Sequence, residues 1–303
     1  GARLMRPDDL MYVDSCSKTH LAALVMRLVA ERVLHLDDTL ALWLPQCQIP
    51  NADRITLRQM LNHTSGIYML NTPEIRTYLR GKPNGPYPPL EMVGLVAGRT
   101  PFFEPGATNR WEYSVSNYLL LGLVIEKACG QSLARVTRDR LFRPLSLNHS
   151  YSAGLEPMPT LQAIPYHEDG APASFYSDYS WTFGAGHIVT SLADLVRFLE
   201  HLAQGKYVSE AMVQQMITPC SETGYALGLF RFTIHSGPLK GTLLHNTGGG
   251  FGTHSVMYHH LESGVTVAAA TNIRLLKAKG PDNPLAASSE ALALAVTETG
   301  DAR

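Results

Sequence analysis

The amino-acid sequence predicts an α+β protein in which a mainly helical part and an antiparallel sheet share an interface. Apolar residues follow a helical period from Ser15 to about Leu145, interrupted by Pro- and Gly-rich loops. From about Tyr225 the pattern changes to short apolar runs separated by turn residues, which is typical of strands. A chain of 303 residues with 45% apolar residues is long enough to bury a large core.

The first long helix is predicted to follow Ser15. Apolar residues recur there at the spacing of one buried helix face: Leu21, Leu24, Val25 and Leu28. Ser15 is therefore expected at or near the N-terminus of this helix, with Lys18 on the same face one turn later. The free N–H groups and the positive dipole end of a helix start favour an alkoxide or an oxyanion there.

The C-terminal part is expected to form an antiparallel sheet with one covering helix. Four short strands are predicted at 225–236, 241–246, 252–260 and 265–272, with turns at 236–238 and 262–264. Strands connected this tightly must run antiparallel. The Ala- and Leu-rich stretch 284–296 is predicted to be a last helix that packs on this sheet.

Composition and charge narrow the classes of partner. The formal net charge of −1 gives no electrostatic reason to expect nucleic acid or an anionic membrane. No apolar run reaches membrane-spanning length and the first residues hold no signal-peptide core, although a targeting segment removed earlier would leave the same N-terminus. Four cysteines without ligand or disulfide spacing favour a reducing, cytoplasmic compartment. The expected partner is a small ester or peptide-like substrate, and the oligomeric state is left open.

Three short motifs in a fixed order carry the chemistry. The first, Ser15-Cys16-Ser17-Lys18, is an SxxK motif that supplies a hydroxyl and an amine one helical turn apart. The second, Tyr113-Ser114-Val115, supplies a phenol that can move a proton, and the third, Asn246-Thr247-Gly248, is a strand edge that can bind an extended substrate. A serine hydroxyl is inert at neutral pH without a base in hydrogen-bond reach. Lys18 and Tyr113 are both candidates for that base, and the sequence leaves open which of them it is.

Each motif alone also has a simpler structural explanation. Ser15 could be a helix N-cap, Lys18 a solvated lysine and Tyr113 a half-buried tyrosine at a helix start. A phosphate loop at Gly248-Gly249-Gly250 is disfavoured, because no helix opens there and no Gly-Lys-Ser/Thr follows. The 12 histidines include no His-Glu-x-x-His and no ligand cluster, so neither a metal nor an organic cofactor is expected. The order and spacing of the three motifs favour a catalytic site.

Collinear segments around these motifs carry a family resemblance. They include SCSKTHLAALVMRLVAERVLHLDDTLALWLP from Ser15, ITLRQMLNHTSGI from Ile55, YSVSNYLLLGLVIEKACGQSL from Tyr113, FGAGHIVTSLADLVRFLEHLAQG from Phe183 and NTGGGFGTHSVM from Asn246. These segments resemble the serine β-lactamase and penicillin-binding-protein superfamily. Within it, the resemblance is to the branch of class C β-lactamases, DD-peptidases, family VIII esterases and mitochondrial lactamase-like peptidases. It extends from about Tyr12 to Asn272.

The resemblance implies a β-lactamase-like fold, in which an antiparallel sheet is flanked by helices and joined by a mainly helical subdomain. It implies one catalytic domain over 1–303, with the helical subdomain at roughly 38–185 and the sheet part at roughly 1–37 and 186–303. Two strands normally precede the nucleophile helix in this family. Only fourteen residues precede Ser15, so the N-terminal strands are expected to be shortened to one short strand at most.

The resemblance also assigns roles around the nucleophile. The backbone N–H groups of Ser15 and Gly249 would form the oxyanion hole, and the strand edge Asn246-Thr247-Gly248 would bind substrate. Asn246 stands where the family usually has Lys or His, and a one-residue slip would place His245 there instead. Val115 stands where peptidases and lactamases normally carry an Asn that donates to the substrate amide. Both departures favour neutral esters.

The sequence therefore predicts a serine hydrolase that acts through an acyl-enzyme on Ser15, with Lys18 and Tyr113 as its proton relay. Carboxylic esters or small acyl compounds are the expected substrates. The alternative within this class is a peptidase or amidase of the DD-peptidase or D-amino-acid peptide type, or a β-lactamase. From a different class, the chain could be a non-catalytic binding or filament-forming module of the same fold. The intact Ser15, Lys18 and Tyr113 argue against that, because a binding module has no need of all three.

Overall fold

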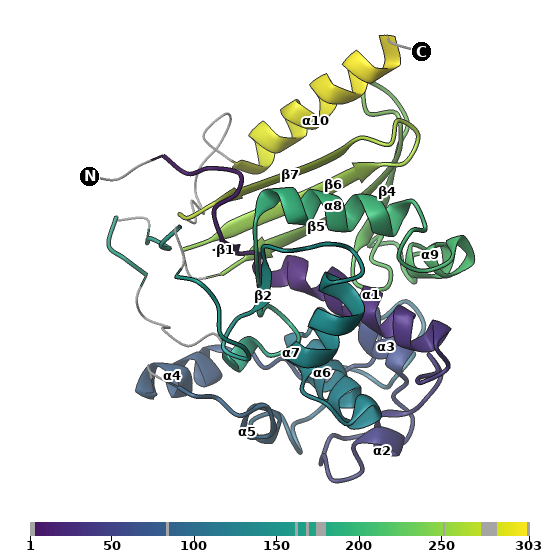
Figure 1. Cartoon of the computed structure of the whole chain (residues 1–303). Coiled ribbons are helices and arrows are strands. Elements are labelled where there is room, and N and C mark those ends of the chain that lie inside the picture. The colour runs from purple at the N-terminus through teal and green to yellow at the C-terminus, as the bar shows by residue number, and fades with distance from the viewer. Residues whose placement is uncertain are drawn as a thin grey trace.

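The structure is a computed structural model that describes residues 4–82, 85–160, 163–167, 170–173, 180–250, 252–273 and 284–301. Its larger sheet consists of β4 (Phe230–Ile234), β5 (Gly241–Gly249), β6 (His254–His260) and β7 (Thr266–Thr271), in that spatial order and with every neighbouring pair antiparallel (Figure 1). The predicted antiparallel sheet is confirmed. β4 begins later than expected, because Tyr225 forms only an isolated bridge with Phe230.

Helices cover both faces of this sheet. Successive strand residues point to opposite faces, and neighbouring residues of β6 join different apolar clusters. Val256 packs with Leu292 of α10 (Pro284–Asp301), whereas Met257 belongs to the main core together with α1 (Ser17–Ala30) and α8 (Leu192–Ala203). The last helix of the chain therefore packs on the sheet as predicted, on the face away from α1.

A second sheet of three short strands joins the N-terminal segment to the helical part. In it, β3 (Ile188–Thr190) lies between β1 (Met11–Tyr12) and β2 (Ser150–Ser152), and both pairings are antiparallel. The described residues before Ser15 thus hold one two-residue strand, which pairs with β3 and not with the larger sheet.

The helical part is built around α6, which also contacts α1. Its helices are α2 (Leu40–Trp43), α3 (Leu57–Leu61), α4 (Pro73–Gly81), α5 (Pro89–Gly94), α6 (Val115–Cys129) and α7 (Leu133–Thr137), followed by the π turn η2 (Arg138–Phe142). Elsewhere lie α9 (Glu210–Met216) and the 3₁₀ turns η1 (Asp14–Cys16) and η3 (Ser180–Thr182). Within the described ranges, no helix is both long and apolar enough to cross a membrane.

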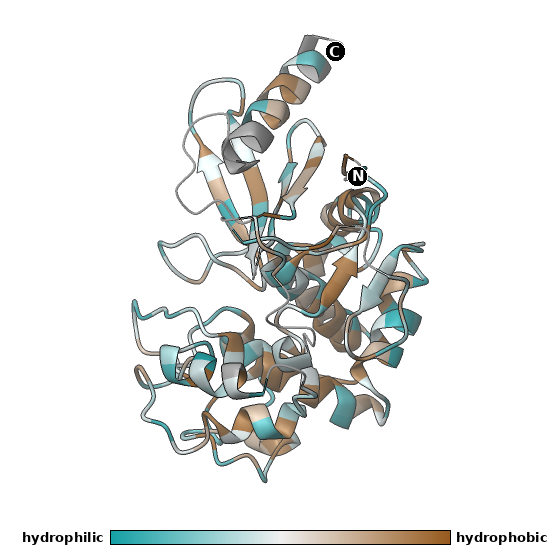
Figure 2. Cartoon of the chain, turned by 90° about the vertical axis from the view of Figure 1, so that its left-hand side faces the viewer, coloured by the Kyte–Doolittle hydropathy of each residue, from teal (hydrophilic) through white to brown (hydrophobic). Residues whose placement is uncertain are grey.

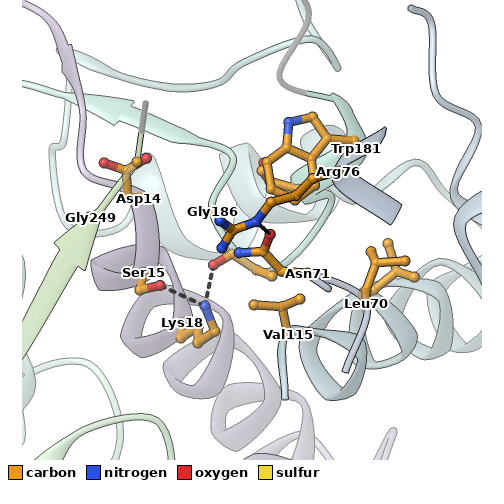
Figure 3. Close-up of a pocket in the computed structure, with 14 residues that line it drawn as sticks. Asp14, Ser15, Lys18, Leu70, Asn71, Arg76, Val115, Trp181, Gly186 and Gly249 are labelled. Carbon is orange, nitrogen blue, oxygen red and sulfur yellow. Dashed lines mark hydrogen bonds between the residues drawn. The ribbon is translucent and has the colours of Figure 1, made fainter. Parts of the chain in front are cut away.

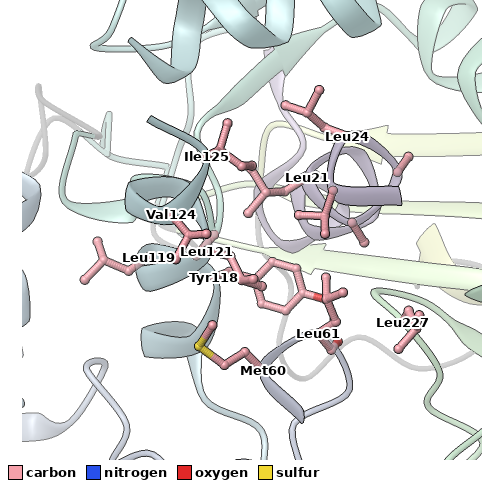
Figure 4. Close-up of a cluster of buried hydrophobic side chains, with 14 of the residues drawn as sticks. Leu21, Leu24, Met60, Leu61, Tyr118, Leu119, Leu121, Val124, Ile125 and Leu227 are labelled. Carbon is pink, nitrogen blue, oxygen red and sulfur yellow. Dashed lines mark hydrogen bonds between the residues drawn. The ribbon is translucent and has the colours of Figure 1, made fainter. Parts of the chain in front are cut away.

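The central core fixes α1, α3 and α6 against one another (Figure 4). Side chains from all three helices are at most 2% exposed, among them Leu21, Leu24, Met60, Leu61, Leu121, Val124 and Ile125. Full burial of each such side chain stabilises the fold by about 1.5–3 kcal/mol. Figure 2 shows apolar residues gathered where helices and sheet meet, with hydrophilic residues over the outer loops. Because Ser15 precedes α1 and Tyr113 precedes α6, this core also sets the distance between them.

Candidate active site

Ser15, Lys18 and Tyr113 meet at a single oxygen atom. Lys18 Nζ donates a hydrogen bond to Ser15 Oγ at 2.9 Å (Figure 3), and Ser15 Oγ shares a second hydrogen bond with the Tyr113 hydroxyl at 2.8 Å. Ser15 lies in η1, directly before α1, so Lys18 falls in the first turn of α1 on the same side. Tyr113 lies two residues before the start of α6. The structure thus brings together three side chains from two distant segments.

Lys18 is 1% exposed and is held by two hydrogen bonds. Besides Ser15 Oγ, its Nζ donates to the carbonyl oxygen of Ala185 at 2.7 Å, and it lies 5.1 Å from the ring centroid of Tyr113. Gly184 makes the Ala185 contact possible. Its φ is +72°, and a Cβ there would overlap the carbonyl oxygen of Tyr118. Glycine therefore lets this loop pack against α6 and present the Ala185 carbonyl to the lysine.

His63 supports the segment that carries Tyr113. Its Nδ1 accepts the backbone N–H of Ser114 at 3.3 Å and lies 3.1 Å from the Asn117 side-chain nitrogen, while its ring centroid is 4.6 Å from that of Tyr113. Burial, and secondarily the nearby Lys18, lowers the pKa of His63 well below 6.5. The imidazole is therefore neutral, with Nδ1 as an acceptor, and it holds Tyr113 in place through its neighbour.

The Asn246 side chain does not line the pocket above Ser15. Its nitrogen donates to Thr19 Oγ1 at 2.9 Å, to the Gly228 carbonyl at 3.0 Å and to the Ser15 carbonyl at 3.3 Å, and the residue is 4% exposed. These contacts tie β5 to the start of α1. Asn246 thus lies on the side of Ser15 away from the pocket, where it holds the Ser15 backbone.

His245, the alternative to Asn246, points to the opposite face of β5. Its ring stacks with Phe230 and Phe232 at centroid distances of 5.1 and 5.0 Å, and Tyr258 lies opposite it on β6. Burial lowers the pKa of His245 to about 4, so it is neutral at pH 7. The alternative assignment, with His245 in place of Asn246, would therefore put a residue of an aromatic cluster at this position of the motif.

Gly248 and Gly249 bring the end of β5 close to Ser15. A Cβ at Gly248 would overlap the carbonyl oxygen of Val13, so a side chain there would push β5 away from the segment that carries Ser15. Gly249, the last residue of β5, lines the same pocket as Ser15. Thr247 is half-buried, and its N–H donates to the Asn246 side-chain oxygen at 2.8 Å. Gly249 and the following Gly250 line the pocket, whereas Asn246, Thr247 and Gly248 are not among its lining residues.

The pocket over Ser15 and Lys18 has an apolar side and a polar side. Val115, the first residue of α6, contributes apolar surface together with Leu70, Leu119 and Trp181. Ligand sites commonly combine such a surface with a few placed polar groups. Among the described residues, no group of three or more His, Cys, Asp or Glu side chains could hold a metal ion.

The polar residues of this pocket that were not predicted from the sequence include Asp14, Asn71 and Arg76. Asp14, directly before Ser15, is 5% exposed, has a positive φ of 45° and accepts from Thr253 Oγ1 at 2.6 Å. Asn71 and Arg76 line the pocket from the other side (Figure 3). Asp14 could have been predicted as a pocket residue, because it directly precedes Ser15 in the sequence. No local pattern marks Arg76, because α4 is placed by long-range packing.

Comparison with known sequences identifies the family of this chain. The sequence matches the family model described as Beta-lactamase over residues 1–291. Esterase EstB of Burkholderia gladioli is 34% identical over 182 residues, which cover 57% of this chain and 45% of the esterase. PbpX of Bacillus subtilis (strain 168), named as a penicillin-binding protein, is 28% identical over 224 residues, or 72% of this chain and 53% of that protein. The chain thus spans about half the length of these two relatives.

Solved structures share the fold. A D-stereospecific amidohydrolase from Streptomyces sp. matches with a TM-score of 0.78 and 27% identity, over 88% of this chain and 82% of that one. The D-amino acid amidase of Ochrobactrum anthropi SV3 matches with a TM-score of 0.80 and 24% identity, over 98% and 85% of the two chains. The predicted β-lactamase-like fold is confirmed. With the family match over nearly its whole length, this chain belongs to the Beta-lactamase family, within the superfamily of serine β-lactamases and penicillin-binding proteins.

Proposed function

We propose that this protein is a serine hydrolase that forms an acyl-enzyme on Ser15 and acts on carboxylic esters or other small acyl compounds. The observation that carries the proposal is the position of Ser15 Oγ, which lies within hydrogen-bond distance of both the Lys18 amine and the Tyr113 hydroxyl. A nucleophile with its base in reach, and with that base held by a third group, is the arrangement that activated serines require.

In this arrangement the proton of Ser15 has two acceptors within reach. Ser15 Oγ lies 2.9 Å from Lys18 Nζ and 2.8 Å from the Tyr113 hydroxyl oxygen, and whichever of these two groups is unprotonated takes the serine proton. As the proton leaves, an electron pair of the serine oxygen bonds to the substrate carbonyl carbon. The charge that moves onto the carbonyl oxygen would be stabilised by the N–H groups of Ser15 and Gly249. Collapse breaks the bond to the leaving alcohol, which takes the proton back from the relay, and a water molecule then repeats the cycle and releases the acid.

Hydrolysis of D-amino-acid amides or peptides is the second candidate. It is favoured by the similarity, at 27% identity, to a D-stereospecific amidohydrolase. Val115 favours esters, because its side chain lines the pocket and cannot donate to a substrate amide. An amide also needs its leaving nitrogen protonated and has a less reactive carbonyl, so the loss of such a donor affects an amide more than an ester.

Covalent labelling tests the proposal directly. Intact-protein mass spectrometry after treatment with a serine-directed fluorophosphonate should show one adduct on the wild type and none on Ser15→Ala. Peptide mapping should place that adduct on Ser15, and Ser17 and Ser114 serve as internal controls. p-Nitrophenyl esters and D-alanyl p-nitroanilide, compared by kcat/KM, then separate esterase from amidase. An unlabelled wild type without turnover would instead identify a non-catalytic module.

A further inference from the structure

Arg76 brings a guanidinium group into the pocket of Ser15, from the side opposite Asp14 and Gly249 (Figure 3). It lies on α4, whose start is fixed because Thr72 accepts the N–H of Ile75 at 3.4 Å and a proline occupies the first helical position. Arg76 Nε donates to the Asn71 side-chain oxygen at 2.7 Å. This contact orients the guanidinium and leaves its two terminal nitrogens for another partner.

No carboxylate of the described residues pairs with Arg76. Other arginines of the helical part do have such partners, at nitrogen–oxygen distances of 2.6, 3.3 and 3.7 Å: Arg54 with Glu104, Arg58 with Asp37 and Arg99 with Glu74. Glu74, two residues from Arg76 on α4, is thus already engaged. Asp14 lines the same pocket from the opposite side, where it accepts from Thr253. The Arg76 side of the pocket therefore carries an uncompensated positive charge.

The position of Tyr113 indicates which part of a substrate this side would hold. Tyr113 is the group placed to return a proton to the leaving group, yet it is not among the residues that line the pocket. The leaving group would therefore lie on the Tyr113 side of Ser15. The acyl chain would then occupy the pocket, between the apolar Leu70 and Val115 and the guanidinium of Arg76.

We propose that Arg76 selects substrates whose acyl chain ends in a carboxylate, which the guanidinium binds through its two terminal nitrogens. A planar guanidinium matches a carboxylate in both charge and geometry. This inference rests on the proposed function and narrows it to anionic esters, such as monoesters of short dicarboxylic acids. It replaces the expectation of neutral esters, which rested on Val115 and Asn246 and did not consider a cation supplied by α4.

The test compares p-nitrophenyl hemiglutarate with its methyl ester, which has the same chain without the charge. The wild type should prefer the hemiglutarate in kcat/KM, and Arg76→Gln should lower the ratio of the two kcat/KM values, hemiglutarate over neutral ester, by ~10-fold or more. Arg135→Gln is the matched control, because Arg135 pairs with Asp139 on the surface and does not line the pocket. It should change neither substrate by more than ~2-fold. Arg76→Lys should restore part of the preference for the hemiglutarate.

Binding of free glutarate separates this inference from the proposed function. Ser15→Ala protein should bind glutarate in isothermal titration calorimetry, and the added change Arg76→Gln should abolish that binding. If this result were obtained with a wild type that hydrolyses no ester, Arg76 would stand as an anion-binding residue and the proposed function would fall. If Ser15 is labelled but glutarate does not bind, or if Arg76→Gln affects both esters equally, the role of Arg76 is refuted and the hydrolase remains.

Discussion

Ser15 Oγ has two hydrogen-bond partners, and each is expected to be required for turnover. Lys18→Met and Tyr113→Phe should each lower kcat for p-nitrophenyl esters by at least ~100-fold, because either change interrupts the route of the serine proton. The double variant should be little slower than the single variants, since both residues serve one relay. Steady-state kinetics give these values, and circular dichroism checks folding. Fully multiplicative effects would contradict a shared relay.

Val115 is the residue at which ester and amide hydrolysis should diverge. Val115→Asn places a donor at the start of α6, where Val115 lines the pocket. One added hydrogen bond to the substrate amide, worth about 1–3 kcal/mol in a dry site, should raise amide turnover relative to ester turnover. The measurement is the ratio of kcat/KM for D-alanyl p-nitroanilide to that for p-nitrophenyl acetate. Val115→Leu, which is close to Asn in shape but has no hydrogen-bond donor, serves as the control. A ratio lowered by Asn would show that Val115 does not set this preference.

The relative positions of residues around Ser15 could be predicted where they depend only on spacing in the sequence. The interval between Ser15 and Lys18 is one helical turn, so any helix that begins there brings them together. Tyr113 could be named from its motif, but its distance from Ser15 depends on how α6 packs against α1. The contacts of the Asn246 side chain with α1 and the position of Arg76 in the pocket depend on packing between distant segments. The residues next to Asn246 and Arg76 in the sequence do not predict this packing.

β5, which carries Gly249, must lie in close contact with the N-terminal segment that carries Ser15. Gly248→Ala would place a Cβ against the backbone oxygen of Val13, and backbone cannot move aside as a flexible side chain can. We expect a loss of more than ~2 kcal/mol in the free energy of unfolding, as for other overpacked sites, and a fall in kcat because Gly249 moves with the strand.

Gly94→Ala is the matched control for that element. Gly94 ends α5, and no atom lies within 4 Å of a Cβ built there, so alanine should be neutral or slightly stabilising. Urea unfolding of the two variants beside the wild type measures the difference. Equal stability of Gly248→Ala and the wild type would show that β5 tolerates a wider separation.

Among the elements, those with strong periodicity were predicted best. The first helix and the last helix follow apolar repeats, and the strands are separated by turn residues, so local sequence is sufficient for them. β4 is shorter than its apolar pattern because the chain at Tyr225 turns back in an isolated bridge. β5 runs on to Gly249, beyond the predicted residue 246, because Thr247 to Gly249 pair with β6. Both differences result from strand pairing, and the apolar pattern of a single strand does not show which of its residues pair with a neighbour.

For the whole molecule, buried histidines couple folding to pH. His20 stacks on Phe198 of α8 at a centroid distance of 3.7 Å, and His187 lies just before β3. Burial lowers the pKa of His20 to about 4 and that of His187 to about 3, and the nearby His20 further lowers the pKa of His187. Burial also lowers the pKa values of His63, His245 and His259.

The stability of this protein should therefore fall as the pH drops below about 6.5, before most carboxylates titrate. In the unfolded chain these histidines take up protons near pH 6.5, whereas the folded chain resists protonation down to about pH 4. The unfolded state thus binds more protons in this window, and each histidine contributes a slope of up to about 1.4 kcal/mol per pH unit.

Urea unfolding should give a nearly constant free energy of unfolding from pH 7 to 8 and a steep decrease from pH 6.5 to 5. His187→Gln should make that decrease shallower, while His235→Gln, at an exposed residue, should keep the wild-type slope. A free energy independent of pH between 6.5 and 5 would show that these side chains are not buried in neutral form.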